Sequence, residues 1–234
     1  MFLKMFSFFL RTVPTFLNKF TYKCFYNLLF HLLKMRRQVV LKNLKRAFPH
    51  KNQDWYNKIS SQCYKFYTKD FLEFLSFPRY FNHDKIKFKN IEILDDALKN
   101  NKGVLFVSGH FGAFDKLFYS LATRGYALCG VAYKQKDGVA DKFFKRIREN
   151  YMKKQLYKGG SSKELKVALN NNEILVLLSD QDAREKGKKV NFFDIPSSTP
   201  SGAAILHKRM GSPIIFFAIT KINDEYFVEF KEIN

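Results

Sequence analysis

The sequence at residues 103–115 is Gly103-Val-Leu-Phe-Val-Ser-Gly-His-Phe-Gly-Ala-Phe-Asp115. Its first half is apolar at consecutive positions and ends in Gly109. Because a strand with one wet face alternates apolar and polar residues, this unbroken run indicates a strand buried on both faces. Similar runs follow at residues 127–133, 173–179, 213–220 and 226–230. The sequence therefore predicts several buried strands, the last of which is either a neighbour of the others or an edge.

Helical patterns lie between these runs, over residues 114–123, 139–151, 162–170 and 202–210. Strands that alternate with helices predict an α/β fold with a largely parallel sheet covered by helices. In such folds the active residues lie on loops that follow the carboxyl ends of strands. Residues 108–115 and 179–194 follow two of the predicted strands, so they are the candidate site loops.

The first 80 residues have a helical pattern that is interrupted at Pro14, Pro49 and Pro78. The longest uncharged run near the N-terminus, residues 24–33, is well short of the ~20 residues of a spanning helix. Apolar side chains in this run recur at helical spacing: Phe25, Leu28, Leu29, Leu32 and Leu33. Basic residues follow from Lys34, so we expect an amphipathic segment in a membrane interface. A surface helix that packs its stripe on the protein's own core is the alternative.

We therefore divide the chain into an N-terminal helical, membrane-interface segment, residues 1–80, and an α/β core, residues 81–234. We expect the core to form one structural unit with the preceding helices. No small-residue cleavage site follows a clean apolar core near the N-terminus, so no secretory signal is predicted.

The chain carries 41 Lys and Arg against 21 Asp and Glu, a formal net charge of +20. A surface this basic favours anionic lipids, phosphorylated substrates or an acidic carrier protein as partners. Tandem zinc-ligand spacings and the aromatic patterns of common RNA-binding modules are absent, so no nucleic acid partner is predicted. Cys24, Cys63 and Cys129 form no CxxC pair and indicate neither a disulfide framework nor a metal site.

His110 directly follows the predicted strand, close to Gly109 and Gly112, and is followed five positions later by Asp115. A carboxylate there can accept a hydrogen bond from one imidazole nitrogen and leave the other free as a base. Imidazole suits removal of a proton from a hydroxyl near neutral pH. Because no serine or cysteine nucleophile is obvious beside it, the simplest scheme is direct attack by an acceptor hydroxyl on a thioester. A structural His110 that caps the following helix is the alternative.

The spacing His110-x4-Asp115 resembles the His-x4-Asp/Glu signature of glycerolipid and lipid A acyltransferases. Further matches resemble one branch, the late acyltransferases of lipid A biosynthesis (the lauroyl/myristoyl acyltransferase family). These matches are Arg37, Asn43-Leu44, Ala47-Phe48-Pro49, Glu73, Tyr133-Lys134, Arg146, Arg148, Ser179-Asp-Gln-Asp182, Phe192-Phe193, Thr199 and Gly202. The resemblance covers roughly residues 36–230.

The resemblance implies a glycerolipid-acyltransferase-like fold and acyl transfer from an acyl carrier protein thioester to a lipid A precursor, without a cofactor. It implies that His110 is the general base and that Asp115 orients it. The predicted substrate-binding residues are Lys134, Arg146, Arg148, Asp180, Gln181, Asp182, Thr199 and Gly202. The cationic side chains supply donors for a phosphate on the acceptor or on the carrier's prosthetic arm. A solvated turn at residues 180–182 and an ordinary helix cap near Ser201 are the structural alternatives.

The resemblance and the basic surface together predict a peripheral or weakly anchored protein on the cytoplasmic face of a Gram-negative inner membrane. The sequence departs from the family at Asp115, where this branch usually has Glu, and at Lys134, where Arg is expected. The chain also ends at Asn234, sooner than family members usually do, which predicts that a terminal helical segment is lacking. An acyltransferase acting on glycerol phosphate or lysophospholipid is one alternative function. A non-catalytic membrane- or carrier-binding protein is another.

Overall fold

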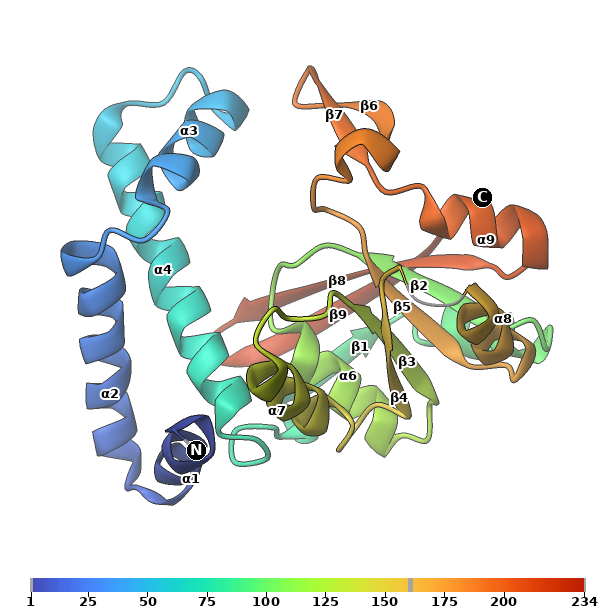
Figure 1. The fold of residues 1–234 in the computed structure, drawn as a ribbon, viewed down its shortest axis with the longest axis horizontal. Helices are drawn as coiled ribbons and strands as arrows, with labels where there is room; N and C mark the ends of the chain where they lie inside the picture. The colour runs from blue at the N-terminus through green and yellow to red at the C-terminus, as the bar shows by residue number, and fades with distance from the viewer. Residues whose placement is uncertain (1, 160–161, 234) are drawn as a thin grey trace. The chain divides into compact units, whose positions relative to one another are not determined.

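The computed structural model describes residues 2–159 and 162–233. Met1, within the predicted N-terminal segment, and Asn234, where the chain ends, lie outside the described residues. The chain divides into two compact units, Met1–Tyr80 and Phe81–Asn234. The first unit is helical, and the second contains the strands of the described chain (Figure 1).

The first unit consists of helices α1 (Phe2–Thr12), α2 (Thr15–Asn27), α3 (Arg37–Ala47) and α4 (Gln53–Leu75), with a π-helical turn, η1 (Leu28–Leu32), directly after α2. Pro14 and Pro49 lie between helices and Pro78 follows α4, because proline has no N–H to continue a helix. The predicted helical pattern of this segment and its three interruptions are confirmed.

Polar side chains join the start of the chain to the end of α4. The Ser7 hydroxyl donates to the Leu75 carbonyl at 2.6 Å. The Asn18 amide donates to the Leu10 carbonyl at 2.9 Å, and Arg79 donates to the same carbonyl at 3.1 Å. The last carbonyls of a helix have no partner within it, so Asn18 and Arg79 stabilise the end of α1.

The apolar face predicted within residues 24–33 is only partly buried. In η1 the Leu33 N–H donates to the Leu28 carbonyl at 2.8 Å, so the turn is wider than an α-helical one. This turn buries Phe30, which was not part of the predicted face, and leaves Leu32 and Leu33 exposed. Among the described helices, none combines the length and the apolarity needed to cross a membrane.

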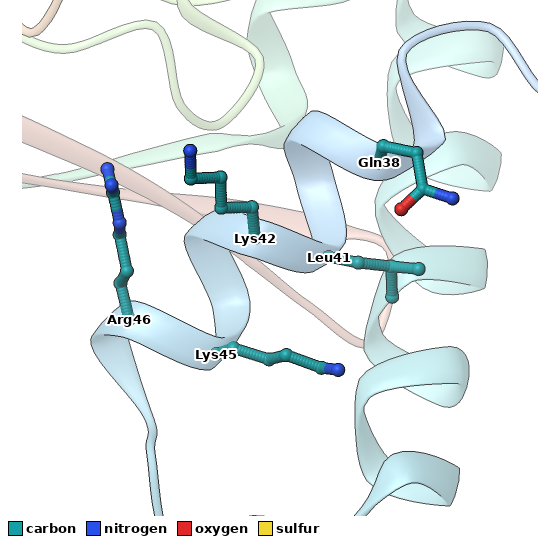
Figure 2. Close-up of a pocket in the computed structure, with 5 residues that line it drawn as sticks. All are labelled: Gln38, Leu41, Lys42, Lys45 and Arg46. Atoms are coloured by element: carbon teal, nitrogen blue, oxygen red, sulfur yellow. The ribbon is translucent and has the colours of Figure 1, made fainter.

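Helix α3 carries a basic surface. Gln38, Leu41, Lys42, Lys45 and Arg46 line a shallow hollow, and Figure 2 shows Lys42 and Arg46 extending side by side from successive turns. Residues four apart lie on the same helix face, so these two cations adjoin each other. Both side chains are exposed.

The second unit alternates strands and helices. Its strands are β1 (Ile86–Lys89), β2 (Val104–Ser108), β3 (Leu128–Ala132), β4 (Lys154–Tyr157), β5 (Ile174–Leu178), β6 (Lys188–Phe192), β7 (Ile195–Thr199), β8 (Ile214–Ile222) and β9 (Glu225–Ile233). Its α-helices are α5 (Glu92–Lys99), α6 (Phe114–Thr123), α7 (Gly138–Arg148), α8 (Ser162–Asn170) and α9 (Gly202–Met210). The 3₁₀ turns are η2 (His83–Lys85) and η3 (Arg184–Lys186).

Seven strands form one sheet in the order β1-β9-β8-β2-β5-β3-β4. The β8–β9 pair is antiparallel and the other pairs of this sheet are parallel. The predicted largely parallel sheet with covering helices is therefore confirmed. Strand β9 lies between β1 and β8, so it is a neighbour of the others rather than an edge. Strands β6 and β7 form a separate antiparallel hairpin, which the sequence pattern did not predict.

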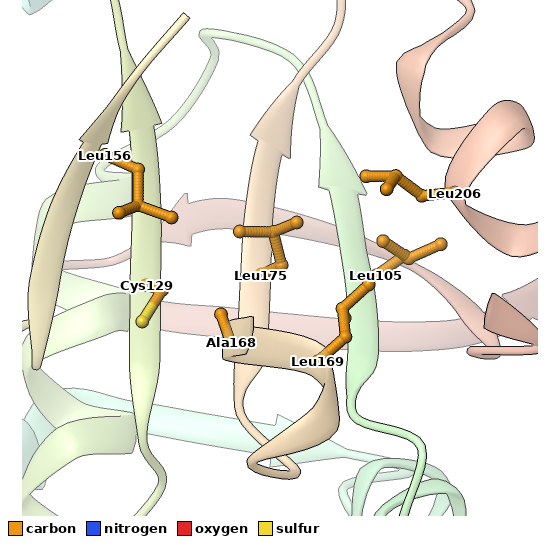
Figure 3. Close-up of a cluster of buried hydrophobic side chains, with 7 residues drawn as sticks. All are labelled: Leu105, Cys129, Leu156, Ala168, Leu169, Leu175 and Leu206. Atoms are coloured by element: carbon orange, nitrogen blue, oxygen red, sulfur yellow. The ribbon is translucent and has the colours of Figure 1, made fainter. Parts of the chain in front are cut away.

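The sheet is buried on both faces, as the unbroken apolar runs predicted. On one face, Leu105 of β2 and Leu175 of β5 pack with Leu169 of α8 and Leu206 of α9 (Figure 3). From the next position of β2, Phe106 stacks on Phe217 of β8 with ring centroids 4.2 Å apart. Successive side chains of a strand point to opposite faces, so β2 takes part in both layers of the core.

Replacement of Phe217 tests the aromatic layer. The Phe217→Ala variant should lose about 3–5 kcal/mol of unfolding free energy, because the fully buried ring leaves a cavity. The control is Ile222→Ala on the same strand, whose side chain is 55% exposed and should change stability by about 0.5 kcal/mol or less. Urea unfolding of both variants measures the difference, and equal stabilities would contradict this layer.

Candidate active site

Two neighbouring parallel strands bring the candidate site loops together. Ser108, the last residue of β2, is paired with Leu178, the last residue of β5. The next residue after β5, Ser179, donates its N–H to the Ser108 carbonyl at 2.8 Å. His110 and Asp180 each lie two residues beyond their strand, so this register places them at the same height above the sheet.

Asp180 holds both the backbone and the ring of His110. One carboxylate oxygen accepts the His110 N–H at 2.9 Å, and the other lies 2.7 Å from His110 Nδ1. An ionised carboxylate can only accept, so Nδ1 carries the hydrogen in this bond. In a neutral imidazole with its hydrogen on Nδ1, the other nitrogen, Nε2, carries no hydrogen and has the lone pair that a base requires.

The surroundings of Asp180 favour its ionised form. Burial raises the pKa of its carboxyl, but the hydrogen bonds from the His110 ring and backbone, with the attraction of the ring, outweigh burial and hold the pKa below its ordinary value. The side chains of His110 and Asp180 are 40% and 43% exposed. Solvent therefore reaches the pair, as an acceptor hydroxyl would have to.

Glycine permits the close approach of the two loops. A Cβ at Gly109 would lie 3.1 Å from Cβ and 3.2 Å from Cγ of Asp180, tighter than an ordinary van der Waals contact. Gly112 has a φ of 67°, and a Cβ there would lie 2.3 Å from the Ile219 carbonyl oxygen. The tight turn and close backbone approach predicted for these two glycines are present.

Asp115 lies in the first turn of α6 and is half-buried. Its carboxylate accepts a hydrogen bond from the Tyr151 hydroxyl at 2.6 Å. Burial raises the pKa of Asp115 above its ordinary value, although Arg148, the Tyr151 hydrogen bond and His110 each act to lower it. His110 thus influences Asp115 electrostatically, whereas the hydrogen bond from His110 Nδ1 is accepted by Asp180. Orientation of His110 by Asp115 stays a prediction.

Arg148 joins this group, whereas Arg146 does not. The half-buried Arg148, at the end of α7, acts on Asp115 and donates from Nη1 to the Gln155 side chain at 3.0 Å. Arg146 is exposed, and its carbonyl accepts from the Asn150 amide at 2.6 Å. The structure therefore gathers His110, Asp115, Arg148 and Asp180.

The other predicted binding residues have different surroundings. Lys134 is exposed and acts electrostatically on Asp141. Asp182 accepts the Arg184 N–H at 2.9 Å, which forms a local turn, and Gln181 beside it is exposed. Thr199 ends β7 and Gly202 begins α9, where Ser201 makes no side-chain cap. These positions stay predictions as substrate contacts.

Tyr151 is a site residue that the sequence did not indicate. It reaches Asp115 from 36 positions along the chain, and its ring packs edge-on against Tyr119. Because Tyr151 has no fixed spacing from the His-x4-Asp motif, no local sequence pattern identifies it as a neighbour of Asp115. In the described part of the chain, no three His, Cys, Asp or Glu side chains gather where they could hold a metal ion.

Comparison with known families finds a match over almost the whole chain. Residues 2–231 match the family described as bacterial lipid A biosynthesis acyltransferase. The matched range includes His110, Asp115, Arg148 and Asp180. No curated protein matches the chain.

Stability against pH should separate the two carboxylates. Asp115 has a raised pKa, so the folded state loses stability as pH rises through that pKa and the carboxyl ionises. The Asp115→Asn variant keeps an acceptor for Tyr151 and avoids this loss, so it should gain stability over wild type as pH rises from 4 to 8.

Asp180→Asn should show the opposite trend. Asp180 has a lowered pKa, so its contribution is present above the ordinary pKa of aspartate, about 3.9, and is lost as pH falls below it. The effect should be smaller because the side chain is 43% exposed. Urea unfolding from about pH 2 to about pH 8 measures both trends, because the Asp180 contribution changes below the ordinary pKa of aspartate, about 3.9. Stability curves that run parallel for the two variants would contradict the assignment of opposite pKa shifts to the two carboxyls.

Proposed function

The chain belongs to the bacterial lipid A biosynthesis acyltransferase family, and from this premise we propose that it transfers a fatty acyl group from an acyl carrier protein thioester to a hydroxyl of a lipid A precursor. The observation that supports a specific mechanism is the His110 ring held at Nδ1 by Asp180. The family match supports acyl transfer, and the donor, the acceptor hydroxyl and the residue roles below are our proposals.

In the proposed reaction His110 Nε2 takes the proton of the acceptor hydroxyl as its oxygen attacks the thioester carbonyl carbon. A C–O bond forms and the C–S bond breaks. The proton then passes from His110 to the leaving thiolate, so the enzyme ends unchanged. The thioester supplies the activated acyl group, and no cofactor takes part in the scheme.

The two carboxylates have different roles in this proposal. Asp180 fixes the ring tautomer through Nδ1 and stabilises the imidazolium that forms. Asp115, which the family resemblance assigns as the partner of His110, acts on the ring through space and is held by Tyr151. Burial raises the pKa of Asp115, and a positive charge on His110 opposes that effect by favouring the ionised form of the Asp115 carboxyl. In the proposed reaction the imidazolium and the Asp115 carboxylate therefore stabilise each other.

The cationic residues supply phosphate contacts in the proposal. Arg146 and Lys134 are exposed, so their charges are available to a phosphate on the acceptor or on the carrier's prosthetic arm. Arg148 is half-buried beside Asp115 and donates to Gln155. In the proposal it both stabilises the Asp115 carboxylate and contributes positive charge for the phosphate. Gln181, Asp182, Thr199 and Gly202 remain proposed acceptor contacts.

Peripheral attachment to the cytoplasmic face of the inner membrane is the proposed location. Helices α1 and α2 expose large apolar side chains: Phe2, Met5, Phe8, Phe9, Phe16, Leu17 and Phe20. Lys4, Arg11 and Lys19 lie among them in the sequence, and Lys23 follows. An exposed apolar surface with interspersed cations suits the interface of an anionic bilayer.

The basic surface of α3 is the proposed docking site for the carrier protein. Lys42, Lys45 and Arg46 line one shallow hollow on this helix (Figure 2). A carrier with an acidic surface is attracted by such a cluster, chiefly through faster association.

Acyl transfer from a labelled acyl carrier protein to a lipid A precursor tests the mechanism. His110→Ala should reduce the rate about 100- to 10,000-fold, because a positioned general base is lost. The control is His50→Ala, which removes an exposed histidine of the helical unit and should keep the wild-type rate. Asp180→Ala and Asp115→Ala show which carboxylate the ring requires, provided that circular dichroism confirms folding.

A folded His110→Ala variant that retains the wild-type rate would make His110 structural. Wild-type protein that acylates glycerol phosphate or lysophospholipid in place of the lipid A precursor would overturn the acceptor. Wild-type protein that acylates none of them would support the non-catalytic alternative.

Reversal of charge on α3 tests carrier docking. Lys42→Glu with Lys45→Glu should raise the KM for the carrier-linked donor roughly tenfold, since two attractive pairs become repulsive. The matched control is Lys208→Glu with Arg209→Glu, an exposed basic pair at the end of α9. Equal KM values for the two double variants would remove α3 as the docking site.

A further inference from the structure

The hairpin β6–β7 of the second unit has apolar residues at its end and basic residues at its base. Every residue of β6, Lys188 to Phe192, is exposed. Near the turn, the exposed fraction is 66% for Phe192, 51% for Val190 and 38% for Ile195. In Figure 1 the hairpin stands off the seven-stranded sheet of the same unit. Packing inside this unit therefore does not explain why these exposed positions carry apolar side chains.

The strand register places the apolar side chains on one face. Val190 pairs with Ser197, and Phe192 pairs with Ile195 at the turn. Paired residues of an antiparallel hairpin point to the same face, as do alternate residues of one strand. Val190, Phe192 and Ile195 thus form a continuous apolar end, which we call the hairpin tip.

The turn itself carries an aromatic residue in an unfavourable backbone conformation. Phe193 and Asp194, the two turn residues, have φ values of 50° and 57°. Such two-residue turns prefer Asn-Gly or Asp-Gly, because a bulky residue is strained at positive φ. Phe193 is nevertheless 49% exposed, with its ring edge-on to Phe192 at 4.7 Å. Because the Phe193 ring is partly exposed, burial of the ring does not offset the backbone strain. The strained turn therefore points to a functional role for this residue and not to a role in stabilising the fold.

Basic residues lie a short way behind the tip. Residues 184–199 contain four cations, Arg184, Lys186, Lys188 and Lys189, against the two carboxylates Glu185 and Asp194. At about 3.4 Å per strand residue, Lys189 and Lys188 lie about 10–14 Å behind Phe192. Apolar groups of interfacial proteins enter a bilayer to about 5–10 Å, so these lysines would lie at the level of the headgroups.

We propose that the β6–β7 hairpin inserts its tip into an anionic lipid bilayer, with Lys188 and Lys189 at the headgroups. An acidic protein would pair with the lysines but would leave the apolar tip in water, whereas a bilayer accommodates both. The contact is additional to the proposed membrane contact of α1 and α2, and it does not depend on acyl transfer.

The base of the hairpin is joined to the loop that carries Asp180. Ala183 donates its N–H to the Ser198 carbonyl at 3.0 Å, and the Ser198 hydroxyl donates to the Arg184 carbonyl. A Cβ at Gly187 would lie 2.1 Å from the Ser198 hydroxyl oxygen, so the base is closely packed. The inserted tip would therefore hold the His110–Asp180 pair near the surface in which a lipid acceptor lies.

A single tryptophan at the tip tests insertion directly. Trp55 is the one tryptophan of the chain, so Phe192→Trp in a Trp55→Phe background gives a single probe. Adding vesicles of phosphatidylglycerol and phosphatidylcholine, without any acyl donor, should shift its emission to the blue. Lipids with brominated acyl chains should quench it. The control is Val167→Trp in the same background, an exposed position on α8 that should keep its emission in water.

The lysines provide a second measurement. Lys188→Gln with Lys189→Gln should lower the partition coefficient onto anionic vesicles roughly fivefold for each lysine removed. The matched control, Lys208→Gln with Arg209→Gln, should leave it unchanged. Vesicles of phosphatidylcholine alone should bind more weakly, and equal binding of both vesicle types would contradict the charge contribution.

Three results would overturn the proposal. One is a Phe192→Trp probe that stays in water while cosedimentation shows the protein bound to vesicles. Another is failure of the protein to bind anionic vesicles. The third is a probe that responds to an acidic carrier protein and not to vesicles. Since all of these readouts are taken without turnover, an enzyme inactive in the acyl-transfer assay would leave the hairpin proposal standing.

Discussion

The register between β2 and β5 is the constraint on which the candidate site depends. Ser108 and Leu178 end their strands side by side, and His110 and Asp180 follow each at the same distance. Both strands are buried on both faces. A slip by one residue would move the side chains that pack beside Leu105 to the opposite face of the sheet, where Phe106 packs, so the register is well defined. Packing far below the site thereby sets a 2.7 Å contact at its surface.

The site combines two carboxylates whose surroundings have opposite effects. Hydrogen bonds from His110 hold the pKa of Asp180 below its ordinary value, whereas burial raises the pKa of Asp115. In the proposed mechanism this difference separates two tasks: Asp180 orients the imidazole and Asp115 responds to its charge. The Asp at position 115, shorter than the glutamate usual in this branch of the family, is held by Tyr151 from another element. The shorter side chain thus has a partner that the motif does not contain.

Large apolar side chains are exposed in both units of the chain. In the first unit they lie on α1 and α2, and in the second they lie at the end of the β6–β7 hairpin. Lysines or arginines accompany them in both places. The surface of a soluble protein rarely carries clusters of large apolar side chains unless they contact a binding partner or a membrane. For a family that takes part in lipid A biosynthesis, a lipid surface agrees with both the positive charge and the exposed apolar side chains.

The sequence by itself determined the α/β fold class, four of the helices to within three residues at each end and the central buried strands, because these depend on local periodicity and on turn residues. It also placed His110 and Asp180 on loops after strands. The tertiary structure decided which strands are neighbours, and hence that Asp180 rather than Asp115 bonds His110 Nδ1. It also revealed the π-turn, the Tyr151 contact and the β6–β7 hairpin. These features depend on pairing and packing between residues far apart in the chain, or on strained backbone, for which a local pattern carries no signal.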